Sequence, residues 1–496
     1  MVRAMEFTEE NFNKQAAQLE RKDVEIQQLK QRLDWLLRKI FGRSSEKIDP
    51  DQLRFEFGSE AVLPGEPEAE DEVEEVKSTR KRRTRRPMKL PENLPVVEDI
   101  IEPNEVLANP DAFKRIGEES FDQLDFTPAT MFIRRTVRPK YVSIEDRELP
   151  PVLAPAPKRI IDQSIASPAL LLHMVISKYC LHTPLYRQAQ DFKRRFGVDL
   201  NFRTMSGWMF QLAEMLAQIY EAMRAEMRAQ PYLQVDETPI RYINPGNGTC
   251  SKGYLWVYNV PHADVLFEWH TGRGNECMEK TLGGFDGHIQ SDGYGAYETF
   301  RKENPDIKLF CCWAHARRKF FEAREESSFA ARTVEEIANL YQVEKTLRKN
   351  AALDRRTLRQ KESVPVLHRM RLELLSEQPR HLPQSLTRKA INYTLTLWDK
   401  LILYAEHSEL EIDNNLVENA IRPTAVGKKN WLFFGGANGG QISAVFYSLI
   451  RSCTARGINP EEYLGEVFDA LPEMTNQSAR DWTPSAWEAR RNPVEN

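Results

Sequence analysis

The chain has 496 residues, of which 41% are hydrophobic and 29% charged, and its formal net charge is −4. This composition is typical of a soluble globular protein, and the length predicts about three domains. No apolar run approaches the roughly 20 residues that a membrane-spanning helix needs, and the N-terminus shows no apolar secretory signal. Six scattered cysteines favour a reduced cytoplasmic protein without structural disulfides.

A heptad pattern marks the N-terminal segment. Apolar residues fill the a and d positions of about three heptads, namely Leu19, Ile26, Leu29, Leu33, Leu36 and Ile40. Such a repeat is typical of a coiled coil, and Gly42 is suited to end the helix. Residues 1–48 are therefore predicted to form a coiled-coil oligomerisation helix. The alternative is a single amphipathic helix that packs on its own domain.

Charge is segregated in the next segment, residues 49–90. An acidic block, Glu66–Glu75, precedes a basic run, and residues 58–90 lack core-forming side chains. We expect a charged disordered linker. Its basic run is suited to neutralise DNA phosphates, and the alternative is a solvated tail that screens the acidic block. The candidate DNA-binding residues are Arg80, Lys81, Arg82, Arg83, Arg85 and Arg86.

Two regions follow the linker. Residues 91–160 are rich in proline, and a strand pair is expected around Phe132–Val142. Residues 161–228 show helical spacing, and a short turn at Gly197 separates two helices that resemble a helix-turn-helix. The second of these helices would begin near Arg203 and bring that side chain to a DNA groove. Plain structural helices are the alternative.

The pattern changes to strands after residue 229. Short β-branched and aromatic runs come first, and strands then alternate with helices. This order predicts an α/β core over residues 229–455 that contains a mixed sheet. Residues 323–410 show helical spacing and interrupt the core as an all-helical insertion. Residues 456–496 are expected to form a C-terminal helix and tail.

Three acidic residues in the core carry the strongest functional signal. Asp236 and Asp292 each end an apolar run, and Glu418 lies on an expected helix. Functional residues gather at strand ends in open sheets, and carboxylates from separate elements can hold two Mg²⁺ ions around one scissile phosphate. The chain holds 73 acidic residues, so their context and not their number carries this argument. Asp413, by contrast, is expected to cap the Glu418 helix.

Basic and aromatic residues follow the Glu418 helix. Lys428 and Lys429 stand beside Trp431, a combination that suits phosphate binding and base stacking; ordinary surface charge is the alternative. Cys312 and His315 lack a second pair of ligands and are weak evidence for a metal site. A structural role is favoured for Cys311 and Cys312, and His315 is suited to contact DNA phosphate or to line the active site. The glycines after Trp431 match no nucleotide-binding pattern, and no nucleotide cofactor is expected.

Six motifs then occur in collinear order from about Leu19 to about Pro472. They are FGRSSEK (Phe41–Lys47), VDETP (Val235–Pro239), SDGYGAY (Ser291–Tyr297), CWAHARRKFFE (Cys312–Glu322), DNNLVENAIRP (Asp413–Pro423) and KKNWLFFGG (Lys428–Gly436). In these motifs the chain resembles the transposases of the insertion-sequence-66 family. The resemblance implies a DDE transposase with a ribonuclease-H-like core built on a mixed sheet. It also implies that Asp236, Asp292 and Glu418 are the catalytic, Mg²⁺-binding acids, with Mn²⁺ as a substitute ion.

The resemblance also exposes a departure. The family carries a small zinc-binding module, built from cysteine pairs, at the place of residues 91–160. This chain has no cysteine before Cys180 and no histidine in that region, whereas a structural zinc site needs about four such ligands. We therefore interpret residues 91–160 as a degenerate zinc-finger-like module, and no zinc is expected.

The leading hypothesis is thus a bacterial, nucleoid-associated DNA transposase that cuts transposon ends and joins them to target DNA. Its expected partners are terminal inverted repeats, target DNA, a second copy of the chain and accessory proteins of the element. A catalytically silent DNA-binding protein derived from a transposase is the main alternative, because the zinc ligands are missing. A metal-independent hydrolase with paired carboxylates is a third, and it leaves the basic run and the heptads unexplained.

Overall fold

The computed structural model describes residues 130–136, 140–141, 152–153, 158–162, 164–244, 249–350 and 352–492, together with Lys22. The predicted coiled coil, the linker and its basic run, and most of residues 91–160 lie outside the described residues. The described residues from 140 onward belong to one compact unit, so the expected helical region, core and C-terminal region pack together. No helix among the described residues is long and apolar enough to cross a membrane.

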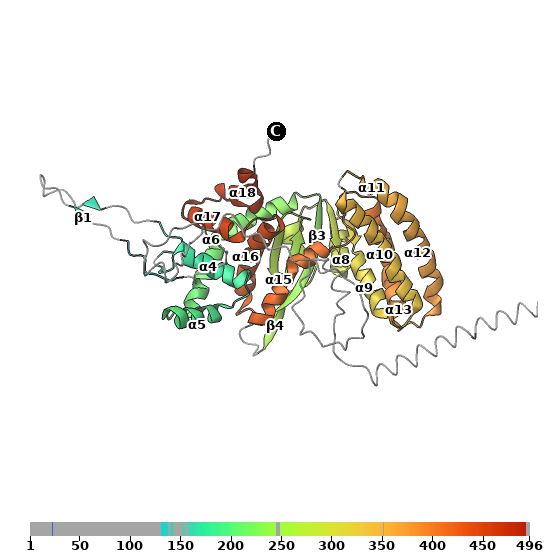
Figure 1. Ribbon diagram of the computed structural model, residues 1–496, viewed down its shortest axis with the longest axis horizontal. Coiled ribbons are helices and arrows are strands. Elements are labelled where there is room, and N and C mark those ends of the chain that lie inside the picture. The colour runs from blue at the N-terminus through green and yellow to red at the C-terminus, as the bar shows by residue number, and fades with distance from the viewer. Residues whose placement is uncertain are drawn as a thin grey trace, which may run out of the picture. The chain divides into compact units, whose positions relative to one another are not determined.

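A five-stranded mixed sheet has the strand order β5-β4-β3-β6-β7. Strands β3 and β4 lie at the centre of this unit, with helices on either side (Figure 1). Three strands form an antiparallel meander: β3 (Tyr232–Ile243), β4 (Cys250–Asn259) and β5 (Val265–His270). Two shorter strands, β6 (His288–Ser291) and β7 (Lys308–Cys311), then run parallel to β3. The predicted α/β class with a mixed sheet is therefore present. Helices α7 (Glu276–Leu282) and α8 (Gly295–Glu303) connect the later strands.

Three helices precede the sheet: α4 (Pro168–Tyr179), α5 (Leu185–Phe196) and α6 (Phe202–Arg228). Local chemistry sets their ends. Ser167 accepts a hydrogen bond from the backbone N–H of Leu170 at the start of α4, and Asn201 accepts one from Arg203 at the start of α6. Gly197 ends α5 with a φ of 70°, a left-handed conformation that glycine adopts without strain. The predicted helix–turn–helix order is thus present.

The edge strand β5 is covered by helix α16 (Ala437–Ala455). The Ser448 hydroxyl accepts a hydrogen bond from the backbone N–H of Phe267 at 2.8 Å, and the Ser452 hydroxyl accepts one from Val265 at 2.9 Å. The Ser452 hydroxyl also bonds the Val265 carbonyl at 3.1 Å. Helix α16 therefore supplies hydrogen-bond partners that a further strand would otherwise provide.

The C-terminal helices pack on the helices that precede the sheet. These are α17 (Pro460–Ala470) and α18 (Pro484–Arg491), with the 3₁₀ helices η5 (Leu471–Glu473) and η6 (Ser478–Trp482) between them. Tyr179 of α4 stacks on Phe446 of α16 with ring centroids 5.0 Å apart. Glu226 of α6 accepts hydrogen bonds from Thr483 and Ser485. Apolar and polar contacts thus join the helices that precede the sheet to the C-terminal helices.

Every regular element among the described residues between β7 and the helix that carries Glu418 is a helix. They are α9 (Trp313–Ala323), α10 (Ser328–Lys349), α11 (Arg355–Leu358), the π-helix η2 (Arg359–Ser363), α12 (Val364–Glu377), η3 (Gln378–Arg380), α13 (Leu386–Thr396), α14 (Trp398–Ile402) and η4 (Leu403–Ala405). Their core includes Phe310 and Cys311 of β7, so this helical insertion, α10 to η4, is packed onto the sheet. The indole N–H of Trp313 donates to the Leu401 carbonyl at 2.8 Å.

The strand pair expected around Phe132–Val142 differs from the structure. Residues 130–136 form no strand, and only Lys140–Tyr141 (β1) is extended in a ladder, where it pairs antiparallel with Val152–Leu153 (β2). The apolar residues Phe132 and Ile133 are 69% and 91% exposed. They therefore lack the buried face that stabilises an isolated hairpin.

Candidate active site

Asp236 and Asp292 come from neighbouring parallel strands. Strands β3 and β6 pair with Gln234 opposite Gln290. Continuing this register by two residues sets Asp236 opposite Asp292, just beyond the end of β6. Because strand side chains alternate, both acids share the sheet face of the two glutamines. The register thus brings together two acids that lie far apart in the sequence.

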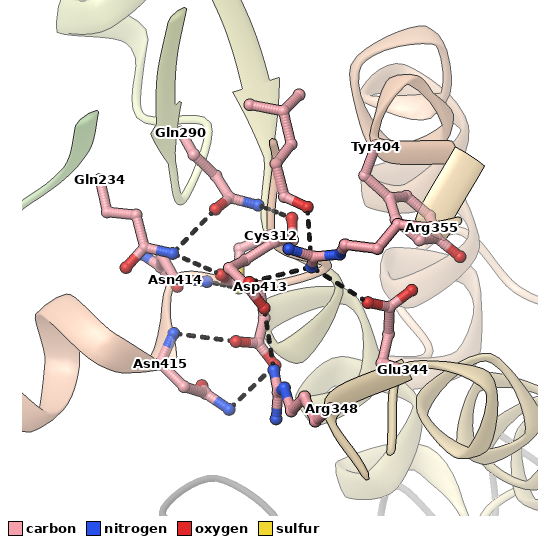
Figure 2. Close-up of polar contacts among 12 residues, drawn as sticks. Gln234, Gln290, Cys312, Glu344, Arg348, Arg355, Tyr404, Asp413, Asn414 and Asn415 are labelled. Carbon is pink, nitrogen blue, oxygen red and sulfur yellow. Dashed lines mark hydrogen bonds and ion pairs between the residues drawn. The ribbon is translucent and has the colours of Figure 1, made fainter. Parts of the chain in front are cut away.

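The two glutamines hold the segment that leads to the third acid. The Gln234 side-chain amide donates to the Asp413 carbonyl at 2.8 Å, and the Gln290 amide donates to the Glu411 carbonyl at 2.8 Å. The Gln234 amide also donates to the Gln290 side-chain oxygen at 3.1 Å. Figure 2 shows this ladder between the sheet and the chain before Glu418. All these groups are buried, so their hydrogen bonds fix the segment on the sheet face.

Arginines of the helical insertion hold the same segment from the other side. Fully buried Arg359 donates to the carbonyls of Tyr404, His407 and Leu410 and pairs with Glu344 at 2.7 Å. Two further arginines, Arg348 and Arg355, bind the Glu411 carboxylate at 3.0 and 2.9 Å. Despite burial, the nearby Arg355 and Arg348 charges keep the pKa of Glu411 below its usual value. The insertion therefore positions the chain that enters the Glu418 helix.

Glu418 lies in the first turn of α15 (Asn415–Trp431), which packs against β3 and β4. The expectation that Asp413 occupies the capping position is wrong by one residue, since Asn414 is the N-cap. Asp413 nevertheless accepts hydrogen bonds from the backbone N–H and the side-chain amide of Asn415 at 3.1 and 3.0 Å. Its carboxylate, one residue earlier, satisfies a donor of the first turn.

The three acids form one electrostatic cluster. Burial raises the pKa of Asp236 well above its usual value, and the carboxylates of Glu237, Glu418 and Asp292 raise it further. Two basic side chains lie near the Glu418 carboxylate, His315 at 3.7 Å and Arg318 at 3.7 Å. Accumulated negative charge of this kind is what a divalent cation relieves, and oxygen ligands suit Mg²⁺. The residues present therefore fit the predicted Mg²⁺ site.

Glu237 is part of this cluster, although the sequence motifs did not single it out. Its carboxylate accepts a hydrogen bond from the Tyr297 hydroxyl at 2.7 Å and pairs with Arg273. The Arg273 guanidinium also lies over the ring of Tyr294, 3.8 Å from its centroid. Glu237 adjoins Asp236, and both tyrosines follow Asp292. These contacts therefore connect the segment of Asp236 to the segment of Asp292. Glu237 and the two tyrosines do belong to the motifs VDETP and SDGYGAY, but the motifs alone do not indicate that these residues are in contact.

Of the remaining predicted site residues, the structure describes Lys428, Lys429, Trp431 and Arg203. Lys428 and Lys429 lie in the last turn of α15, and burial together with the Lys429 charge lowers the pKa of Lys428. Trp431 stacks on Phe434 with centroids 4.8 Å apart, so one face of its ring is already covered. Arg203 is exposed at the start of α6.

Cys312 is structural. Its side chain is fully buried, and its sulfur accepts a hydrogen bond from the backbone N–H of Asn414 at 3.3 Å. His315, three residues further along the same motif, faces Glu418 instead. The two residues therefore do not converge on a common ligand position, and the burial of Cys312 agrees with the structural role expected of that cysteine.

Comparison with known proteins agrees with the sequence resemblance. Residues 163–442, more than half of the chain, match the family described as Transposase IS66 family, and residues 28–98 match the one described as Transposase C of IS166 homeodomain. Two similar proteins are the uncharacterized proteins y4jD and y4qI of Sinorhizobium fredii (strain NBRC 101917 / NGR234). The first is 33% identical over 467 residues, 89% of this chain and 91% of that protein. The second is 31% identical over 477 residues, 92% of this chain and 86% of that protein. The chain belongs to the IS66 family of transposases.

Proposed function

We propose that the protein is a DDE-type DNA transposase with a ribonuclease-H-like core, which cuts DNA at transposon ends and joins the freed ends to target DNA. The observation that carries this proposal is the convergence of Asp236, Asp292 and Glu418. Two of these acids come from adjacent parallel strands, and the third comes from a helix. Hydrogen bonds from Gln234 and Gln290 hold the segment before that helix on the sheet. The strand order also supports the proposal, because a three-stranded antiparallel meander followed by two parallel strands suits a core of this type.

The chemistry is in-line displacement at phosphorus. In cleavage, the oxygen of water bonds to phosphorus and the bond to the 3′ oxygen breaks, which leaves a 3′-hydroxyl; water loses a proton and the leaving oxygen gains one. In strand transfer, the freed 3′ oxygen bonds to a target phosphorus and displaces a target 3′ oxygen. Bound Mg²⁺ would act as a Lewis acid and lower the pKa of the attacking hydroxyl. Asp236, Asp292 and Glu418 would hold it.

The neighbours of the acids have distinct tasks in this proposal. His315 and Arg318 flank the Glu418 carboxylate at 3.7 Å each, so they orient it, and Arg318 offers positive charge to a DNA phosphate. Glu237 accepts its hydrogen bonds from Tyr297 and Arg273, and it is thereby turned away from a metal-binding role. It is best assigned as a positioning residue for Asp236 and for the segment after Asp292.

A DNA path is suggested by the cations at the end of α15. Lys428 and Lys429 adjoin each other there, and Arg187 of α5 donates to the Asn430 side chain at 3.3 Å. This contact sets the first helix of the helix–turn–helix beside the basic end of the Glu418 helix. Phosphate contacts position a protein on DNA without reading sequence. We therefore assign this surface to backbone binding, and recognition of the inverted repeats to the exposed start of α6 near Arg203.

The decisive experiment is strand transfer by the purified full chain with a labelled transposon end and a supercoiled target. The proposal expects cutting and joining in Mg²⁺ or Mn²⁺ and no product with a chelator. Binding of ends without cutting in any metal would instead identify a catalytically silent derivative. Neither binding nor cutting, with and without accessory proteins of the element, would overturn both assignments.

A further inference from the structure

Two histidines and a glutamate meet at the end of β6 opposite to Asp292. His288 begins β6, and His407 and Glu409 lie in the segment that leaves the helical insertion. One ligand atom from each lies within 4.8 Å of the others. Asp292 lies four positions after His288, about 13 Å along an extended chain, so this cluster is distinct from the three acids.

The separations suit a transition-metal ion. Nδ1 of His288 and Nδ1 of His407 lie 3.6 and 3.2 Å from the same oxygen, Oε1 of Glu409. Around a tetrahedral ion with ligands at about 2.0–2.1 Å, neighbouring ligand atoms are roughly 3.4 Å apart. Both distances to Glu409 are thus close to the edge of such a tetrahedron, and the ligand atoms of the two histidines lie within 4.8 Å of each other. Two imidazoles and one carboxylate are also a ligand set that zinc uses, with water in the fourth position.

The surroundings point to a ligand rather than a plain ion pair. Nδ1 of His288 is buried and makes no hydrogen bond, which is costly for a polar atom. The Phe310 ring packs against both imidazoles, with centroids 5.1 Å from His288 and 5.5 Å from His407. Glu409 is 42% exposed, which leaves an open side for water and for entry of an ion.

The charge balance also permits an ion. Lys308 is the further cation near His288, and its side chain is exposed at the start of β7.

We propose that His288, His407 and Glu409 bind one divalent transition-metal ion of the zinc type. The ion would connect the start of β6 to the segment before the Glu418 helix. Arg359, Gln234 and Gln290 bind this same segment through its backbone carbonyls. It would hold the sheet and the exit of the insertion together from outside the catalytic cluster. This site departs from the expectation that the chain takes no zinc, which rested on residues 91–160 alone.

Cobalt is the probe, because Co²⁺ occupies zinc sites and absorbs visible light there. The full chain, stripped with chelator and desalted, is titrated with Co²⁺ in excess Mg²⁺. The proposal expects one strongly absorbing Co²⁺ per chain, displaced by Zn²⁺ and retained in Asp292→Asn. His407→Gln and Glu409→Gln should each weaken binding by more than about tenfold. Zn²⁺ should also raise the Tm of the wild type and leave that of Glu409→Gln unchanged.

The matched control is His368→Gln, which removes an exposed histidine of α12 and should bind Co²⁺ as the wild type does. Because Glu409 is exposed, its variant tests the site even where a substitution of His288 impairs folding. Unchanged Co²⁺ absorption in both His407→Gln and Glu409→Gln would overturn the proposal. Loss of the absorption in Asp292→Asn would overturn it too, since the ion would then belong to the catalytic acids.

Discussion

Gln290 of β6 donates a hydrogen bond of 2.8 Å to the backbone carbonyl of Glu411. The strand that presents Asp292 is thereby tied directly to the segment that precedes Glu418. Arg348 and Arg355 bind the side chain of the same Glu411. One residue thus connects the sheet, the helical insertion and the helix of the third acid.

Neutralising any one of the three acids should abolish DNA cleavage. Asp236→Asn, Asp292→Asn and Glu418→Gln keep side-chain volume and remove one ligand charge. The loss should exceed about 100-fold, because weakening groups behind metal ligands already costs 10–100-fold. Cleavage of a labelled end in Mg²⁺ measures the effect, and end binding by gel shift should persist. Full cleavage by one variant would remove that residue from the site.

Gln290→Met should lower cleavage while the fold survives. The substitution leaves the buried Glu411 carbonyl without its donor, a cost of about 1–3 kcal/mol, and loosens the segment before Glu418. Cleavage rate and Tm are measured together, with exposed Gln211→Met on α6 as the control. A variant with normal cleavage and a lowered Tm would show that this bond stabilises without positioning the acid.

Arg359→Met should destabilise the protein strongly. It leaves the buried Glu344 carboxylate with the longer Arg355 contact at 3.5 Å, and removing one partner of a buried pair costs about 3–5 kcal/mol. Urea unfolding of the variant and of the double variant Arg359→Met/Glu344→Met separates the charge effect, since the double variant should recover part of the loss. Arg369→Met breaks an exposed pair with Glu336 at 3.1 Å and should cost less than about 1 kcal/mol.

Asp413 should make the folded state sensitive to pH in the acidic range. Burial raises the pKa of Asp413 from 3.8 to about 6. Folding therefore favours its neutral form, and this contribution to stability is present below pH 3.8 and lost as the pH rises to about 6. Relative to Asp413→Asn, the wild type should lose up to about 3 kcal/mol over that interval. Urea unfolding from pH 4 to pH 7 tests this, and parallel curves would contradict it.

Replacing the arginines of Arg80–Arg86 with glutamine should weaken binding to all DNA sequences alike. For every phosphate that the run no longer neutralises, the slope of log K against log salt should flatten by about 0.9. Binding to end-containing and unrelated duplexes across a salt series measures both effects. A loss confined to transposon ends would instead assign the run to sequence recognition.

Sequence patterns indicate the candidate residues but not how their elements come together. Asp236 and Asp292 each end an apolar run, whereas the choice of Glu418 depends on the motif DNNLVENAIRP and the family resemblance. The strand register that pairs Gln234 with Gln290 could not be read, since long-range pairing leaves no local periodicity. The same holds for Arg359, whose helical segment looks like any charged helix surface until its burial is known. His288, His407 and Glu409 show no ligand spacing in the sequence, because only the fold brings them together.

The covered edge of β5 limits how copies of this protein can associate. Strand addition is a common route to dimers and fibres, and it needs free backbone groups along an edge. Here Ser448 and Ser452 occupy those of Phe267 and Val265. Two copies that meet on DNA would therefore not pair by strand addition at this edge, and the edge carries little risk of irreversible sheet growth.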